Sequence, residues 1–266
     1  SYSIKKKVSK SNKSTSLFKK LANKINQKLK LAYSIVFAVS VFLCCVLIII
    51  GYLWYKQPPL FFPKWRQYQV YGIDVSKYQR TINWEHVEKD GIQFTIIKAT
   101  EGARKKDKNF SDNWNDCSKT SIVKGAYHFY RVDIPWTEQF ENFTSQVKLQ
   151  SGDLPPVVDI EYDEGMNKAI ITRDLKRFLI ALENHYKVRP IIYTYESFYN
   201  DFLLDKFRNY TLWIASYQDS PPILKDGAHW DFWQYSEEGS IEGIKSYVDL
   251  NCFYGNPEQL NKLRIK

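Results

Sequence analysis

The stretch from Pro156 to Asp163, with the sequence PVVDIEYD, is the most informative part of this chain for its fold. Its short apolar run is typical of a buried strand, in which successive side chains point to opposite faces. Asp159 and Glu161 therefore share one face with Val157. Their backbones lie roughly 6–7 Å apart along such a strand. The sequence thus predicts two carboxyl groups side by side at the end of a buried strand.

Two acids at this spacing repel each other when both are ionised, so one of them tends to keep its proton. Glycosidases use this arrangement, with a protonated acid for the leaving oxygen and a charged partner for the developing sugar cation. A strand that runs out into solvent also carries Asp and Glu often, and a single D-x-E motif does not separate the two interpretations. Other parts of the chain are needed to choose between a catalytic acid pair and a strand end exposed to solvent.

The basic charge of the chain is confined to one segment. The 266 residues carry a formal net charge of +9, and residues 1–30 contain ten lysines and no acid. Without those ten, 28 basic residues face 29 acidic ones, a balance of −1. Such an arm can bind nucleic acid or anionic lipid. Beside a membrane span, membrane topology is the simpler explanation, and no nucleic-acid partner is expected.

A long apolar run follows this arm, from Leu31 to Tyr55. Residues 32–53 carry no charge and span roughly 33 Å as a helix, which is enough for a bilayer. More lysines precede the run than basic residues follow it, which places the preceding arm in the cytoplasm. We expect four segments: a basic cytoplasmic arm (1–30), a transmembrane signal anchor (31–55), a Pro-rich tether (56–69) and a barrel domain (70–266) outside the cytoplasm.

Cysteine and histidine usage indicates neither a metal nor another cofactor. Cys44 and Cys45 fall inside the expected span, where they are apolar fillers. Cys117 and Cys252 would be exported, and an oxidising compartment permits a disulfide that the sequence does not establish. The four histidines lack metal-ligand spacing.

Strand-like and helix-like stretches alternate from residue 70 onward, which predicts a parallel sheet with helices outside. A stretch of 197 residues is short for an eight-fold barrel, typically about 250. The helical signal fades beyond Ala215, so we expect an α/β fold, a modified TIM-like (β/α) barrel with fewer helices than strands. Strands are expected near 70–75, 94–98, 125–130, 157–161, 190–194, 211–215, 231–235 and 246–249, and helices near 83–90, 111–118, 135–149, from Thr172, and 196–204.

Acids follow several of these strands. Asp74 ends the first strand, Asp159 and Glu161 end the fourth, and Asp249 ends the last. Because chemistry gathers at the carboxyl ends of barrel strands, and the first and last strands are neighbours after closure, we expect these acids to meet at one rim. Aromatic residues gather near the same ends, where they either stack on sugar rings or serve as core. They are Tyr127, Tyr130, Tyr193, Tyr195, Trp213, Tyr217, Trp233 and Tyr235.

Seven sequence blocks follow one another in this part of the chain: YGIDVS (71–76), IKATEG (97–102), GAYHF (125–129), VDIE (158–161), WIASY (213–217), FWQYS (232–236) and VDLN (248–251). In this order they resemble the family 25 glycoside hydrolases, the Chalaropsis-type lysozymes. The resemblance covers roughly residues 71–255 and leaves out the arm and the anchor.

The resemblance implies cleavage of peptidoglycan between N-acetylmuramic acid and N-acetylglucosamine. Glu161 resembles the proton donor, and Asp159 resembles the carboxylate that stabilises the cation or orients the substrate's acetamido group. Asp74 and Asp249 resemble flanking acids that tune this pair, and Asp231 resembles a further rim acid. The residues expected to bind the glycan are Tyr127, Tyr193, Trp213 and Gln234.

Two rival functions remain open at this point. A chitinase-type N-acetylhexosaminidase would carry a longer acidic run, and Val157 stands where one of its aspartates is expected. A membrane-tethered glycan-binding protein without turnover would keep the aromatics but would not need the acids. No G-x-S-x-G motif and no phosphate-binding glycine loop is present.

Overall fold

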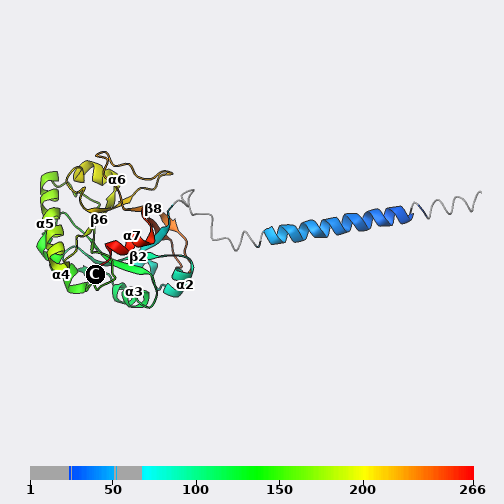
Figure 1. Ribbon diagram of the computed structural model, residues 1–266, viewed down its shortest axis with the longest axis horizontal. Helices are drawn as coiled ribbons and strands as arrows, with labels where there is room; N and C mark the ends of the chain where they lie inside the picture. Colours follow the sequence, from blue (N-terminus) through cyan, green and yellow to red (C-terminus); the bar gives the residue numbers. More distant parts are fainter. Residues whose placement is uncertain (1–23, 25, 51, 53–67) are drawn as a thin grey trace, which may run out of the picture. The chain divides into compact units, whose positions relative to one another are not determined.

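The computed structural model describes residue 24, residues 26–50, residue 52 and residues 68–266. The chain divides into two compact units, Ser1–Leu60 and Phe61–Lys266. In the first unit, the helix Asn26–Ile50 is long and apolar enough to cross a membrane (Figure 1). None of its most apolar stretch is buried against other parts of the chain. Most of the expected lysine arm (1–30) and tether (56–69), and the end of the expected span (31–55), lie outside the described residues.

The second unit is a barrel. Nine strands form one sheet in the order β1-β9-β8-β7-β6-β5-β4-β2-β3, and pairing between β1 and β2 closes it. The two-residue strand β3 pairs only with β2, so the other eight strands form the wall. This confirms the expected TIM-like barrel. The strands are β1 (Val70–Val75), β2 (Phe94–Glu101), β3 (Lys105–Lys106), β4 (Val123–Phe129), β5 (Val157–Asp159), β6 (Ile191–Tyr195), β7 (Thr211–Ala215), β8 (Phe232–Gly239) and β9 (Val248–Phe253).

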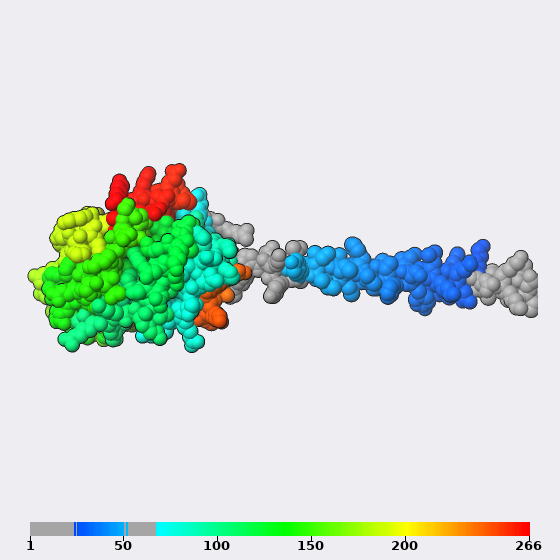
Figure 2. Space-filling model, turned by 90° about the horizontal axis from the view of Figure 1, so that it is seen from below, coloured from blue at the N-terminus to red at the C-terminus, as the bar shows by residue number. Residues whose placement is uncertain are grey.

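Helices surround the first two thirds of this wall (Figure 1). In the space-filling view, the green region of α3 and α4 makes up much of the visible face, and the C-terminal helix α7, in red, lies at its edge (Figure 2). No helix of the described part separates β7 from β8 or β8 from β9, as the sequence predicted. The helices are η1 (Lys77–Gln79), α2 (Trp84–Lys89), α3 (Phe110–Cys117), α4 (Trp136–Gln146), α5 (Lys168–Tyr186), α6 (Glu196–Phe198), the π-helical turn η2 (Tyr199–Leu203) and α7 (Pro257–Leu263).

The sheet is not parallel throughout, and this corrects one expectation. Strand β9 runs antiparallel to both β8 and β1, because a loop without a helix joins it to β8. Parallel neighbours need a crossover connection, whereas antiparallel ones do not. Asp249 therefore lies near the start of its strand rather than at its end. It still reaches the expected rim, because the amino end of β9 lies beside the carboxyl end of β1, with Asp249 opposite Asp74.

A second correction concerns the longest helix. The sequence predicted a helix that starts at Thr172 as its N-terminal cap, whereas α5 begins about one turn earlier, at Lys168. The Oδ1 atom of Asn167 accepts a hydrogen bond from the amide of Ala169 at 2.8 Å, so Asn167 is the cap. Thr172 instead donates its hydroxyl hydrogen to the carbonyl of Lys168 at 2.9 Å. Both residues are good caps, and the sequence alone does not choose between them.

The alternation of side chains along the strands separates two apolar clusters. Val157 belongs to the cluster inside the barrel, whereas Val158 and Ile160 belong to the cluster between the wall and the helices. This confirms the expected faces of the fourth wall strand in sequence, β5. Asp159 and Glu161 consequently continue the inner face beyond Val157.

Large apolar side chains fill the amino end of the barrel interior. Phe94 and Phe232 meet edge to face with ring centroids 5.2 Å apart, and Phe253 packs on Phe232 at 4.9 Å. Gly72 faces this cluster, where a Cβ atom would lie only 2.5 Å from the Phe94 ring. Helix α7 adds Leu260 to the same cluster. The amino end of the barrel is therefore closed, and the carboxyl end is where a ligand can enter.

Candidate active site

The carboxyl end of the barrel holds an open cavity of about 220 Å³. All eight side chains that the sequence predicted for the site line this cavity. They come from seven strands and from the residue two beyond β5, so barrel closure alone brings them together. Their catalytic and binding roles stay predictions. The eight are Asp74, Tyr127, Asp159, Glu161, Tyr193, Trp213, Gln234 and Asp249.

Backbone hydrogen bonds hold Asp159 and Glu161 in place from both sides. The carbonyl of Asp159 accepts from the amide of Tyr130 at 2.7 Å, on the β4 side. On the β6 side, the amide of Ile160 donates to the carbonyl of Tyr193 at 3.0 Å, and the Thr194 hydroxyl donates to the carbonyl of Ile160 at 2.6 Å. The chain thus keeps its extended course one residue past β5. This course delivers Glu161 to the rim on the same face as Asp159.

The environment of this pair favours protonation. Burial, followed by the charge of Asp74, raises the pKa of Glu161 to about 7. Burial and the neighbouring Glu161 also raise the pKa of Asp159 well above its ordinary value. The ammonium group of Lys98 opposes both shifts. Two close carboxyl groups in such a place cannot both ionise readily, so near neutral pH the pair retains a proton.

Asp159 is the more enclosed member of the pair, with only 5% of its surface exposed. Its Oδ1 atom is buried and has no hydrogen-bond partner among the described residues. Buried polar atoms in proteins are nearly always paired. This carboxyl oxygen therefore offers an acceptor position at the floor of the cavity.

Asp74 and Asp249 form a second coupled pair beside the first. The Oδ1 atom of Asp74 accepts from the side-chain amides of Asn251, at 2.8 Å, and Gln234, at 2.9 Å. Burial and the charge of Asp74 raise the pKa of Asp249 to about 9. Asp249 therefore keeps its proton at neutral pH and hydrogen-bonds to Asp74. Burial raises the pKa of Asp74 as well, but the two amides and this proton favour its charged form, so Asp74 ionises before Asp249.

A polar framework holds these acids in position. The oxygen of the Gln234 side chain accepts from the hydroxyls of Tyr193, at 2.8 Å, and Tyr217, at 2.7 Å. The indole of Trp213 donates to Asn251 Oδ1 at 2.8 Å. Because Trp213 and Gln234 are almost fully buried, they act mainly by holding other groups. The half-exposed Tyr217 and the exposed Tyr78 provide ring surface at the mouth of the cavity.

Two polar residues that act on the rim acids were not predicted from the sequence. Asn251 lies two positions after Asp249 on the same face of β9, and Lys98 follows Phe94 and Ile96 at the same spacing on β2. The period of two would have placed both side chains at the rim. The sequence does not show that they interact with the acids.

Three other predicted features lie away from the cavity. Asp231 precedes β8, at the opposite end of the barrel, and its Oδ2 atom accepts from the amide of Leu212 at 2.9 Å. It is therefore not a rim acid. Cys117 and Cys252 are free thiols buried in the outer cluster, and burial raises the pKa of Cys117 to about 12. Within residues 68–266, no group of three or more His, Cys, Asp or Glu is arranged to hold a metal ion.

Comparison with known proteins gives a consistent result. The profile described as glycosyl hydrolases family 25 matches residues 73–244. Protein YegX of Escherichia coli O6:H1 is 36% identical over 198 residues, which cover 73% of this chain and 72% of that protein. Lysozyme M1 of Streptomyces globisporus is 35% identical over 205 residues, with 72% and 70% covered. The structure of a family 25 glycosyl hydrolase from Bacillus anthracis has a TM-score of 0.72 and 36% identity, and it covers 75% of this chain and 95% of its own.

Proposed function

The chain belongs to glycosyl hydrolase family 25, and we propose that it is a muramidase. The bond that it hydrolyses is the β-1,4 linkage between N-acetylmuramic acid and N-acetylglucosamine in peptidoglycan. The names of its relatives, which include Lysozyme M1 and the N,O-diacetylmuramidase of Chalaropsis, support this substrate.

The observation that carries this proposal is the carboxyl pair at the rim. Burial raises the pKa of Glu161 to about 7 and raises that of Asp159 well above its ordinary value, so near neutral pH the pair keeps a proton that a leaving glycosidic oxygen can take. General acids work best when their pKa lies near the operating pH. An acid with an ordinary pKa would have lost this proton at neutral pH.

In the proposed mechanism, Glu161 gives its proton to the glycosidic oxygen as the bond to the sugar breaks. Asp159 faces the sugar that develops positive charge, and it either stabilises that charge or accepts a hydrogen bond from the acetamido N–H. Its unpartnered Oδ1 atom suits both tasks. Once Glu161 has lost its proton, its carboxylate accepts a proton from a water molecule whose oxygen bonds to the anomeric carbon, and this restores the acid.

The second acid pair supports the first. Ionised Asp74 lies among the charges that raise the pKa of Glu161, so it helps to keep the proton donor protonated. Protonated Asp249 and the amide of Gln234 hold Asp74 in that position. The partly exposed ring of Tyr127, which lines the same cavity, supplies apolar surface for the face of a sugar, and the buried Tyr193 acts through its hydroxyl.

We also propose that the apolar helix anchors this unit to a membrane. The helix Asn26–Ile50 is long and apolar enough to cross a bilayer, a property that a signal sequence shares. Ten lysines in residues 1–30 support an orientation with the arm in the cytoplasm and the barrel outside. The chain would then consist of the arm 1–30, the anchor 31–55, the tether 56–69 and the hydrolase 70–266, acting on nearby wall.

The deciding experiment measures the release of reducing ends from purified peptidoglycan by the full chain in detergent. We expect Glu161→Gln to lower the rate by about 10³-fold, because general acid catalysis contributes about 10²–10⁴-fold. Glu141→Gln is the matched control, since Glu141 is exposed on α4, away from the cavity. Equal rates for the parent chain and Glu161→Gln would refute the mechanism.

Mass spectrometry of the released fragments identifies the bond that is cut. A muramidase leaves N-acetylmuramic acid at the new reducing end, whereas a glucosaminidase leaves N-acetylglucosamine. A protein that binds glycan without turnover releases neither. Detection of N-acetylglucosamine ends alone would assign the site to the other class of N-acetylhexosaminidase.

A further inference from the structure

A second, smaller cavity adjoins the catalytic groove beside the hairpin formed by β2 and β3. Tyr78 and Lys98 line both cavities, so the two share a wall. Four of the lining residues are lysines and two are acids. We call this cavity the lysine cleft, and its lining residues are Lys77, Tyr78, Lys98, Glu101, Lys105, Lys106 and Asp107.

Two of the lysines share one acid as their ion-pair partner. Glu101 Oε2 lies 3.0 Å from the Nζ atom of Lys98, and its Oε1 atom lies 2.8 Å from that of Lys105. These contacts contribute to a lowered pKa of Glu101, so it stays charged at neutral pH. The lysine–glutamate–lysine chain keeps a positive charge in excess.

The second acid neutralises neither remaining lysine. Asp107 Oδ2 accepts from the backbone amide of Lys77 at 2.9 Å, and its Oδ1 atom accepts from the amide of Asn109 at 2.9 Å. Its carboxylate is thus occupied by backbone donors. The side chains of Lys77 and Lys106 form no ion pair with any described residue. Both are exposed and free to meet an anion.

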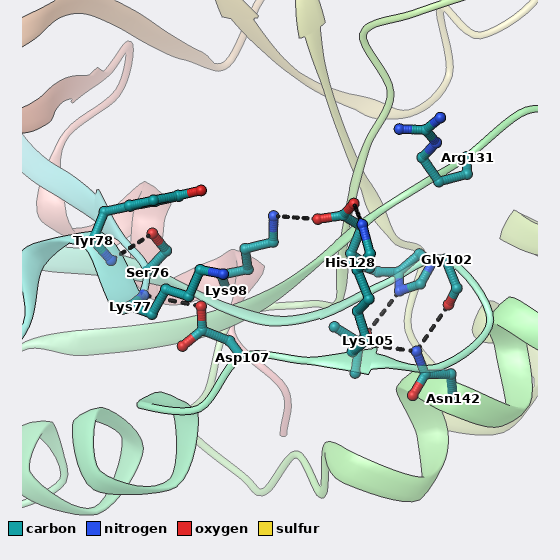
Figure 3. Close-up of polar contacts among 12 residues, drawn as sticks. Ser76, Lys77, Tyr78, Lys98, Gly102, Lys105, Asp107, His128, Arg131 and Asn142 are labelled. Atoms are coloured by element: carbon teal, nitrogen blue, oxygen red, sulfur yellow. Dashed lines mark hydrogen bonds and ion pairs between the residues drawn. The ribbon is translucent and has the colours of Figure 1, made fainter. Parts of the chain in front are cut away.

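Hydrogen bonds from three elements fix the walls of the cleft (Figure 3). The side-chain amide of Asn142, on α4, donates to the carbonyls of Gly102 at 2.8 Å and Lys105 at 3.1 Å, which pins the hairpin. Asp107 joins the hairpin side to η1 through the amide of Lys77. Figure 3 shows Lys77 and Lys98 between Tyr78 and the hairpin. The cleft is therefore a preformed cationic site.

Resting on the muramidase function proposed above, we infer that the lysine cleft binds carboxylates of the peptide attached to muramic acid. Muramic acid differs from glucosamine by a lactyl ether, whose carboxyl group carries a peptide with acidic groups in cell walls. A muramyl residue held against Glu161 places that substituent outside the sugar ring. The cleft that shares a wall with the groove receives it there.

The cleft suits this flexible ligand. A lysine ammonium is a point charge with three donors on a mobile stem, so it accepts a carboxylate in many orientations. Exposed ion pairs are individually weak. Two unpaired lysines, Lys77 and Lys106, therefore predict a preference of about 3–10-fold for an acidic substituent over a neutral one of the same shape.

The test measures binding, which does not depend on turnover. Full-length Glu161→Gln in detergent is titrated with two soluble tetrasaccharides of peptidoglycan. One carries its peptides with free carboxylates, and the other carries the same peptides with these groups converted to carboxamides. We expect the acid form to bind about 3–10-fold more tightly at 50 mM NaCl, with the preference largely lost at 500 mM NaCl because salt screens exposed charges.

Two further variants assign the effect to the cleft. Adding Lys77→Ala and Lys106→Ala brings the ratio of the two affinities close to one, whereas Lys77→Arg with Lys106→Arg keeps most of the preference because the charge remains. Lys176→Ala with Lys262→Ala removes the same charge from exposed positions on α5 and α7, and the ratio stays at its parent value.

Equal affinities for the two tetrasaccharides, or an unchanged ratio after the alanine substitutions, would overturn the inference. The outcome is separable from that of the proposed function. Hydrolysis of peptidoglycan without any preference refutes the lysine cleft alone. A charge-dependent preference in a chain that never releases reducing ends refutes the muramidase function and leaves the cleft in place.

Discussion

The two ends of the barrel interior are built on the same strands and the same strand face, yet they have opposite physical character. The amino end is filled by apolar side chains such as Phe94 and Leu260. The carboxyl end holds four acids with raised pKa values and one lysine, Lys98. Burial of apolar side chains at the amino end stabilises the folded state, whereas the carboxyl groups at the other end would be more stable in water.

This contrast shows how the fold separates stability from chemistry. The burial of apolar side chains at the base stabilises the fold, and this offsets the free-energy cost of holding buried carboxyl groups at the rim. The two ends share continuous strands, but the acids lie outside the apolar cluster. Substitutions at the base should then change stability without changing the protonation of the rim. Substitutions at the rim should change activity, and some of them should increase stability.

The largest effect is expected at the base. Phe94→Ala removes a fully buried ring that packs on Phe232, and this should lower the free energy of unfolding by about 3–5 kcal/mol. Urea unfolding followed by tryptophan fluorescence measures the loss. Ile223→Ala is the control, since Ile223 is 79% exposed, and should cost no more than about 0.5 kcal/mol. A loss below 1 kcal/mol for Phe94→Ala would contradict the role of the base.

An intermediate effect is expected where the framework holds the acids. Asn251→Ala removes a partner of both Asp74 and the Trp213 indole, so it should cost about 1–3 kcal/mol of stability and lower kcat/KM. Asn113→Ala is the matched control, because Asn113 is equally buried but its Nδ2 atom has no partner. If both variants lose the same stability, the hydrogen bonds of Asn251 are not what the rim depends on.

The smallest effect is a shift in the pH profile. Because Glu161 must be protonated, and its pKa is about 7, kcat/KM should fall about tenfold per pH unit above neutral pH. Lys98→Met removes the cation that lowers the pKa of Glu161, and with it the contact of Lys98 Nζ with the Phe129 ring, but keeps an unbranched side chain. The alkaline limb should then move to higher pH. A limb that moves to lower pH would show that Lys98 does not act on the pair electrostatically.

The sequence predicted the barrel and the meeting of its acids because both follow from strand periodicity and from parallel topology. The inner face of Val157, Asp159 and Glu161 needed only a period of two. The direction of β9 was not predicted, because nothing in residues 246–253 distinguishes a parallel strand from an antiparallel one. Asp249 lies at the rim nevertheless, because β9 extends beyond Asp249 instead of ending at it, and the amino end of this antiparallel strand lies beside the carboxyl end of β1.

The hydrogen bonds and charge contacts within the site were not predicted, because they join segments that are distant in the sequence. Asn251 and Gln234 converge on Asp74 only after the barrel closes, so no local pattern indicates which acid they bind. The pairing of Lys98 with Glu101 is local, but the nearness of Lys77 depends on how η1 lies against the hairpin. Propensity alone could not choose Asn167 over Thr172 as the cap of α5.

The central claim is that the fold holds the rim acids in an environment that disfavours their charge. Because the pKa of Asp159 is raised in the folded state, this group contributes more stability below its unfolded pKa than above it, and the contribution is lost as the pH rises. Replacing Asp159 by asparagine, which is neutral and of the same shape, removes this loss of stability at high pH. Asp159→Asn should therefore be more stable than the parent chain at pH 8 and similar to it at pH 3.

The most direct measurement is the free energy of unfolding of Asp159→Asn and the parent at both pH values, together with the release of reducing ends. We predict that the variant is more stable at pH 8 by about 1 kcal/mol or more, and that it loses nearly all activity. A variant that is less stable than the parent at pH 8, or that keeps its activity within about threefold, would contradict this account.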